Sequence, residues 1–218
     1  MSFKKLSGLT LACAMALGAA SAQAGLVVSL YDGATTITIA DNQVGDLDPS
    51  NNNIAYFGSI GVWTYSFSGA ISSAPDGQPG VHFTSADSSS GAGTLRVTFQ
   101  TTDYAFNNPT GATSVVSGFS STTAGTVQAD TFLKVDPSTS FSLVSSQGPM
   151  GPGSVAQTVA TPVNIGGNFD LKQTVTIVHS ARGTTSFDDQ VSVPEPAILG
   201  LLGLGLLGFG FARRRASS

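Results

Sequence analysis

Cysteine is almost absent from this 218-residue chain, which contains only Cys13. A chain with one cysteine forms no internal disulfide. If Cys13 is removed with a leader peptide, the mature protein also lacks a thiol nucleophile and thiolate metal ligands. Stability must then come from a packed core, and the roughly 170 residues between the two ends of the chain are enough to build one.

Basic residues and glutamate are also scarce between residues 25 and 193. This region contains twelve aspartates and no glutamate, for a net charge of −8, and its only cations are Arg96, Lys134, Lys172 and Arg182. Nucleic-acid binding requires a basic patch that neutralises phosphates. The composition therefore excludes nucleic acid as a partner.

Helical periodicity is missing from the same region, where apolar and polar residues alternate. In "TLRVTFQT", Leu95, Val97 and Phe99 share one face of a strand, as the period of two requires. Clusters such as "APDGQPG" and "NNPTGA" supply turns, and residues 146–153 are expected to form a loop. We predict an all-β body over residues 25–192, an antiparallel β-sandwich or jelly roll of eight to eleven strands.

The candidate catalytic residues are few. His179 is interpreted as a partly buried packing residue and His82 as a structural residue, because no G-x-S-x-G elbow or other catalytic motif accompanies them. Asp188 and Asp189 are adjacent and should point to opposite faces at a solvated strand end. No catalytic residue is assigned, and we expect a protein that is not an enzyme. A secreted hydrolase would require an aspartate close to one of these histidines within a pocket.

The sequence offers two candidate binding sites, one for calcium and one for a sugar. Asp46, Asp48, Ser50 and Asn52 alternate in "GDLDPSNNN" and offer oxygen ligands for calcium. The remaining EF-hand positions fail, so an Asx-rich turn is preferred and no metal or other cofactor is expected. Trp63, Tyr65 and Phe67 share one face and could form a sugar-binding platform, although such a stripe is more often core. The ligand of the body stays unknown.

The N-terminus has the pattern of a secretory signal peptide. Lys4 and Lys5 precede an apolar run, and Ala22 and Ala24 occupy the small-residue positions before Gly25. We predict a signal helix over residues 1–24, cleaved by signal peptidase before Gly25. A lipoprotein signal at Cys13 is the rival interpretation, but the residues ahead of the cysteine fit it poorly.

The chain ends in "VPEPAILGLLGLGLLGFGFARRRASS", residues 193–218. Pro194 and Pro196 flank Glu195 and keep the backbone extended. Residues 197–212 carry no charge and are predicted to form a transmembrane helix. The cations Arg213, Arg214 and Arg215 prefer the cytoplasmic side, so the body would lie outside the inner membrane.

These three parts, in this order, resemble the C-terminal sorting signal of PEP-CTERM proteins, which is also catalogued as an ice-binding-protein C-terminal motif. The resemblance implies recognition by an exosortase, removal of the tail, and delivery of the body to the cell surface or extracellular matrix. The resulting expectation is an exported structural or adhesive protein, associated with exopolysaccharide or biofilm matrix. The alternative is a carbohydrate- or ice-binding β-sandwich.

Overall fold

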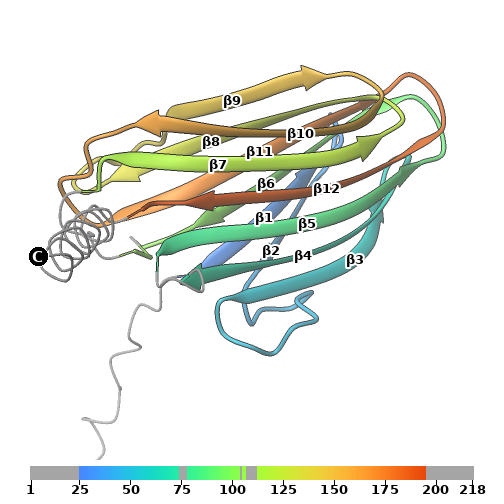
Figure 1. Ribbon diagram of the computed structural model, residues 1–218. Helices are drawn as coiled ribbons and strands as arrows, with labels where there is room; N and C mark the ends of the chain where they lie inside the picture. The colour runs from blue at the N-terminus through green and yellow to red at the C-terminus, as the bar shows by residue number, and fades with distance from the viewer. Residues whose placement is uncertain (1–24, 74–77, 104, 107–111, 195–218) are drawn as a thin grey trace, which may run out of the picture.

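The computed structural model describes residues 25–73, 78–103, 105–106 and 112–194 (Figure 1). The predicted signal peptide with Ala22 and Ala24 lies outside these ranges, as do the predicted transmembrane helix and the sorting residues from Glu195 onward. Within the described ranges, no helix is long and apolar enough to cross a membrane.

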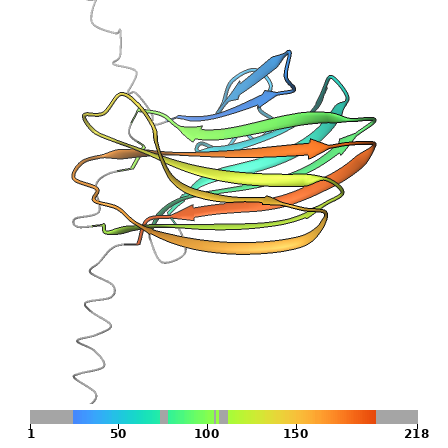
Figure 2. The ribbon, with the colours of Figure 1, turned by 90° about the horizontal axis from the view of Figure 1, so that it is seen from above.

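The described chain forms two antiparallel six-stranded sheets, and this confirms the predicted all-β sandwich (Figures 1 and 2). Sheet A has the order β2-β1-β6-β11-β8-β9 and comprises β1 (Leu26–Tyr31), β2 (Thr36–Ala40), β6 (Gly93–Thr101), β8 (Thr126–Val135), β9 (Ser142–Met150) and β11 (Phe169–His179). Sheet B has the order β10-β7-β12-β5-β4-β3 and comprises β3 (Asn53–Ile60), β4 (Trp63–Ser73), β5 (Pro79–Ser89), β7 (Ser114–Thr123), β10 (Gly153–Pro162) and β12 (Gly183–Ser192).

Twelve strands exceed the predicted eight to eleven, and the predicted loop over residues 146–153 is wrong. Its first part belongs to β9, and Gly151 and Pro152 alone connect β9 to β10. The glycines and prolines of "QGPMGPG" favour a turn locally. Edge strands nevertheless tolerate proline, because one side of their backbone needs no partner.

The core lies between the sheets and follows the period-two pattern. On β6, Leu95, Val97 and Phe99 are buried while Thr94 and Arg96 point outward. Aromatic rings join the layers, since the Phe99 ring of sheet A stacks on the Phe83 ring of sheet B at a centroid distance of 4.9 Å.

The two ends of the sandwich differ. Six short connections between described strands gather at one end, the hairpin end, on the right in Figure 1: residues 32–35, 61–62, 90–92, 124–125, 151–152 and 180–182. At the opposite, proximal end the Gly25 amide donates to Thr102 Oγ1 at 3.2 Å, and the Val193 amide donates to the Pro79 carbonyl at 2.9 Å. Both termini of the body therefore lie at the proximal end.

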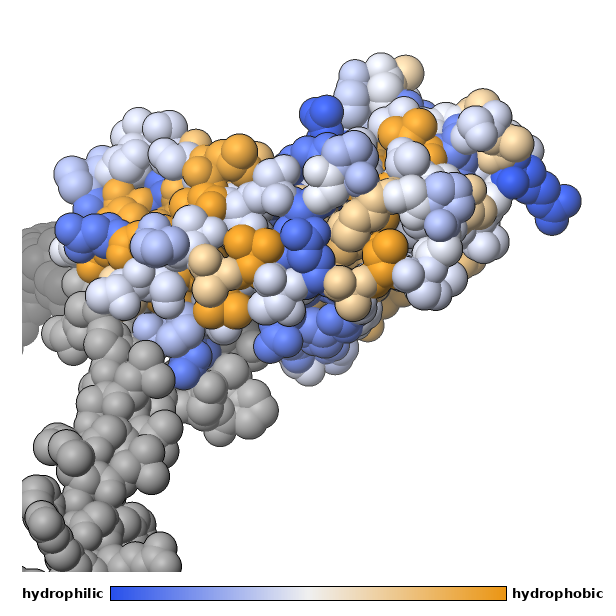
Figure 3. Space-filling model, turned by 45° about the horizontal axis from the view of Figure 1, so that its top comes forward, coloured by the Kyte–Doolittle hydropathy of each residue, from blue (hydrophilic) through white to orange (hydrophobic). Residues whose placement is uncertain are grey.

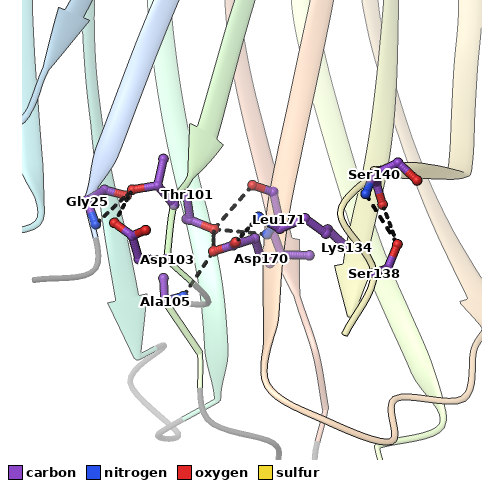
Figure 4. Close-up of polar contacts among 10 residues, drawn as sticks. Gly25, Thr101, Asp103, Ala105, Lys134, Ser138, Ser140, Asp170 and Leu171 are labelled. Atoms are coloured by element: carbon purple, nitrogen blue, oxygen red, sulfur yellow. Dashed lines mark hydrogen bonds and ion pairs between the residues drawn. The ribbon is translucent and has the colours of Figure 1, made fainter. Parts of the chain in front are cut away.

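A buried carboxylate organises the proximal end (Figure 4). Asp170 is fully buried, and its Oδ1 accepts hydrogen bonds from Thr101 Oγ1 and the Ala105 amide, both at 2.9 Å. Its Oδ2 lies 2.7 Å from Lys134 Nζ. The carboxylate thus ties β6 and the residues after it to β8 and β11.

Candidate functional site

The aromatic stripe of β4 is core, as the preferred interpretation of its alternation expects, and the alternative of a sugar-binding platform is wrong. Trp63, Tyr65 and Phe67 are exposed by 1%, 1% and 3%. Their common face of β4 points into the core, where Tyr65 and Phe67 stack on each other and Phe67 packs edge-on against Phe83. The three side chains share one face, and that face serves packing.

The surface that sheet B presents to solvent is built from the alternate residues of the same strands. Most of these outward-facing side chains are small. The register of the strands aligns them in rows that run across the sheet from β3 to β10. One row contains Phe57, Ser66, Ala86, Ser186, Thr122 and Ser154, and the next contains Ala55, Ser68, Thr84, Asp188, Ser120 and Ala156. We call these two rows, with the residues beside them, the hydroxyl face. Neighbouring strands lie about 4.8 Å apart, so each row spaces its side chains regularly.

Shallow hollows cover this face. Two of them flank Phe57, which is 64% exposed, and Ser66 and Ala86 line both. Two more follow the row of Ser120 and Asp188 toward β10. Phe57 is the large exposed aromatic of the hydroxyl face. It follows the partly buried Tyr56 on β3, and the sequence alone does not indicate which of these two adjacent aromatic residues faces solvent.

On the hydroxyl face His82 Nε2 lies 2.7 Å from Asp188 Oδ2. The two side chains are 46% and 49% exposed. The distance that a hydrolase would require is therefore met, although the pair lies on an open surface where Asp188 borders two of the shallow hollows and His82 borders neither. No sequence signal predicts the pairing, because the residues are 106 positions apart.

His179 is the buried packing histidine that its position on β11 predicts. Its Nδ1 lies 2.7 Å from Ser89 Oγ, and its Nε2 lies 2.8 Å from Thr185 Oγ1. The Trp63 ring covers it at 4.8 Å. Burial lowers the pKa of His179, which favours the neutral imidazole. Its ring joins the two sheets near the hairpin end.

Asp188 and Asp189 point to opposite faces, as predicted, but the predicted solvated strand end is wrong. They lie in the middle of β12, and Asp189 is only 1% exposed. Burial, with a smaller contribution from the Asp188 charge, raises the pKa of Asp189 to about 8. The alternation of Phe187, Asp189 and Val191 could have indicated this burial.

Asp87 on β5 is another buried carboxyl group with a raised pKa. Burial raises its pKa to about 7, and the hydrogen bond that Ser85 Oγ donates to its Oδ1 at 2.9 Å opposes this shift. At its other oxygen, Oδ2, the described residues place no hydrogen-bond partner. Near neutral pH, Asp189 is therefore expected to be mostly protonated and Asp87 about half protonated.

The candidate calcium ligands build a turn. Asp46 Oδ1 accepts hydrogen bonds from the amides of Asp48 and Ala55, both at 3.0 Å, and Asp48 Oδ1 accepts one from the Ser50 amide at 2.9 Å. The Asn52 amide donates to Asp41 Oδ2 at 2.8 Å. In the part of the chain that the structure describes, no group of three or more His, Cys, Asp or Glu side chains could hold a metal ion.

A further cleft of about 600 Å³ lies at the hairpin end, lined among others by Trp63, Ser88 and Arg182. Arg182 belongs to the connection between β11 and β12 and is the cation of this cleft. The buried Trp63 Nε1 has no hydrogen-bond partner among the described residues.

The fold and the tail together define an all-β sandwich that continues into a C-terminal sorting signal. The pattern of the PEP-CTERM protein-sorting motif matches residues 192–215. The chain thus carries the signal that Pro194, Glu195, Pro196 and the arginine cluster predict. The motif implies export, a membrane-anchored sorting precursor, and an exosortase as processing partner.

Comparison with curated proteins finds no match. Among solved structures, the module TmCBM61 in complex with β-1,4-galactotriose is 12% identical with a TM-score of 0.34, covering 61% of this chain and 88% of that one. The family 11 carbohydrate-binding module from Clostridium thermocellum, in complex with a mixed-linked tetrasaccharide, is 12% identical with a TM-score of 0.32, covering 77% and 95%. The enzymatically active domain of tailspike protein 4 from bacteriophage CBA120 is 14% identical with a TM-score of 0.39, covering 71% and 21%. Likenesses this distant carry no argument about function.

Proposed function

We propose that the exported body is a non-enzymatic, adhesive component of the cell envelope or extracellular matrix, and that its hydroxyl face contacts hydrated exopolysaccharide. The observation that carries the proposal is the regular array of small hydroxyl side chains across the outside of sheet B, with Phe57 exposed at one end of a row. This role follows export and sorting through the C-terminal signal.

The chemistry of the hydroxyl face suits a neutral or weakly charged glycan. Serine and threonine hydroxyls both donate and accept hydrogen bonds, as sugar hydroxyls do. The hollows beside Phe57 combine an apolar ring with Ser66 and other small polar residues, the mixture that orients a bound small molecule. A flat, shallow surface favours many weak contacts along a polymer over tight binding of one sugar.

The same surface supports the proposal that the protein is not an enzyme. Catalysis of glycoside hydrolysis uses two carboxyl groups on either side of the bond. On the hydroxyl face the pair of His82 and Asp188 brings a single carboxylate, and both side chains are about half exposed to water. Such a pair resembles an ordinary surface contact.

The test is binding of the processed body, residues 25–194, to exopolysaccharide purified from the producing cells, measured by co-sedimentation and calorimetry. Phe57→Ala is expected to weaken binding about fivefold or more, because it removes the apolar stacking surface. Ser186→Gln fills two of the hollows and should weaken binding as well.

The matched controls lie on the opposite sheet. Tyr31 is the exposed aromatic of β1 at 38%, and Thr174 occupies the middle of the outer face of sheet A. Tyr31→Ala and Thr174→Gln should bind like the unchanged body. Equal losses from both pairs, or no binding at all, would contradict the proposal. Thermal hysteresis in place of glycan binding would favour the ice-binding alternative, and release of reducing ends would reveal a hydrolase.

A further inference from the structure

Among the described strands, the outer edge of β10 is an open strand edge, unlike the other three edges of the sandwich. The strand has ten residues in continuous register with β7, and none of them is charged. All of its side chains are exposed or partly exposed. A long, regular, uncharged edge presents unpaired amides and carbonyls and is a template for another strand.

The other edges are protected. Strand β2 has only five residues. The β9 ladder is interrupted at two places, which disturbs pairing on both of its sides. On β3, the Ala55 amide donates to Asp46 Oδ1 and the Ala55 carbonyl accepts from the Leu47 amide, so the preceding loop covers that edge.

The direction of the unpaired groups on β10 follows from one hydrogen bond. The Val163 amide donates to the Thr113 carbonyl at 2.9 Å, in the register that pairs β10 with β7. Because hydrogen-bonded positions alternate along an antiparallel ladder, the odd-numbered residues of β10 face β7. The amides and carbonyls of Ser154, Ala156, Thr158 and Ala160 therefore point outward, and Pro162, which has no amide, ends this series.

We propose that two processed bodies pair through β10 as an antiparallel, two-fold symmetric dimer. Pairing Ala156 of one subunit with Thr158 of the partner subunit, and Ser154 with Ala160 of the partner subunit, uses every outward amide from Ser154 to Ala160. A register shifted by one residue in either subunit would place Pro162 or an inward-facing group in the ladder. The favoured register also sets Val155 opposite Val159 of the partner subunit, a β-branched pair that stabilises cross-strand contacts.

The surface around this edge fits a second copy of the same chain. The edge carries no charge, so self-pairing meets no like-charge repulsion. Figure 3, which turns the β9 and β10 edge toward the viewer, shows apolar patches separated by polar residues. Leu143 on the neighbouring β9 is 57% exposed, and Val155 and Val159 are partly exposed. A two-fold contact would cover part of this apolar surface.

The pairing has a consequence for the hydroxyl face. An antiparallel dimer joins the two copies of sheet B into one continuous sheet, and the hydroxyl faces of both subunits then lie on the same side. This consequence rests on the proposed glycan-binding function, whereas the dimer itself does not. Dimerisation can therefore be measured without polysaccharide, and its failure is distinguishable from a failure of binding.

The experiment compares charge patterns on the processed body, residues 25–194, which contains all twelve strands. The unchanged body should sediment as a dimer whose fraction rises with concentration. In Ala156→Lys/Thr158→Lys, like charges face each other across the symmetric edge and should weaken dimerisation about tenfold. In Ala156→Lys/Thr158→Asp, each lysine faces an aspartate, and the dimer should persist.

Two single cysteine variants test the register and do not depend on added charge. The processed body has no cysteine of its own. In the proposed register Gln157 lies opposite its own copy at a closely spaced position, so Gln157→Cys should form a disulfide-linked dimer on oxidation, whereas Val155→Cys should not. A body that stays monomeric at every concentration, equal association of the two charge variants, or equal crosslinking of the two cysteine variants overturns the proposal.

Discussion

Lys134 Nζ lies 2.7 Å from Asp170 Oδ2, and the two residues come from adjacent strands of sheet A, β8 and β11. The Asp170 side chain is fully buried, whereas that of Lys134 is 17% exposed. The Lys134 ammonium group therefore compensates the charge of a buried carboxylate. The same carboxylate also accepts hydrogen bonds from Thr101 Oγ1 and the Ala105 amide.

Lys134→Met should destabilise the body strongly, because the buried Asp170 carboxylate loses its compensating charge. The expected loss is about 3 kcal/mol of unfolding free energy, measured by urea denaturation of residues 25–194. Lys172→Met is the matched control. That lysine covers the Phe132 ring at 4.1 Å, and its loss should cost less than about 1 kcal/mol. Similar losses in both variants would contradict a special role for the ion pair.

The stability of the body should fall as the pH rises from about 4 to 8. Burial raises the pKa of Asp189 to about 8 and that of Asp87 to about 7, above the ordinary value of 3.8. A group whose pKa is higher in the folded state stabilises the fold fully below its unfolded pKa. That contribution is lost as the pH rises through the folded pKa.

Asp189→Asn should flatten this part of the pH profile, since asparagine does not ionise. Thermal unfolding between pH 4 and 9 measures the effect. The lowered pKa of buried His179 acts with the opposite sign at acidic pH, but it is present in both proteins and cancels in the comparison. Asp103→Asn, at an exposed position, is the control. A variant with the same slope as the unchanged body would show that Asp189 is not the titrating group.

The alternation of apolar and polar residues predicted the strands and their buried faces, but the burial of Asp189 was not predicted. The pattern around Val97 and Phe99 identified strands and their buried side, because a sheet with one solvated face imposes period two. The same rule, applied to Phe187, Asp189 and Val191, indicates that Asp189 is buried. The residue type alone favours the opposite, because adjacent aspartates are usually solvated.

The candidate site depended on pairings that no local pattern contains. The hydroxyl face exists because the register aligns Ser66, Ala86 and Ser186 across three strands, and each of these residues is unremarkable in its own segment. The contact between His82 and Asp188 likewise joins adjacent strands that are distant in sequence. Such sites become visible only when the strand order is known.

Gly69 on β4 is predicted to be essential for the packing of the two sheets. A Cβ at this position would collide with the Phe99 ring, which reaches across from sheet A to stack on Phe83. Gly69→Ala should therefore cost about 1–3 kcal/mol through overpacking. The combination with Phe99→Leu should lose less than the sum of the two single changes, because the smaller side chain relieves the collision. Strict additivity in urea denaturation would show that the two residues do not compete for the same space.

Calcium should have no effect on the loop that precedes β3. Asp46 uses Oδ1 to accept two backbone amides, while its Oδ2 accepts the Asn42 amide at 2.9 Å, so the carboxylate is already occupied in folding the turn. Addition of millimolar calcium or of a chelator is expected to leave the midpoint of thermal unfolding unchanged. Asp46→Ala should lower stability by about 1–2 kcal/mol through the lost hydrogen bonds, with or without calcium. A rise in the unfolding midpoint on adding calcium, abolished by Asp46→Ala, would instead establish a metal site, because a ligand that binds only the folded state stabilises it.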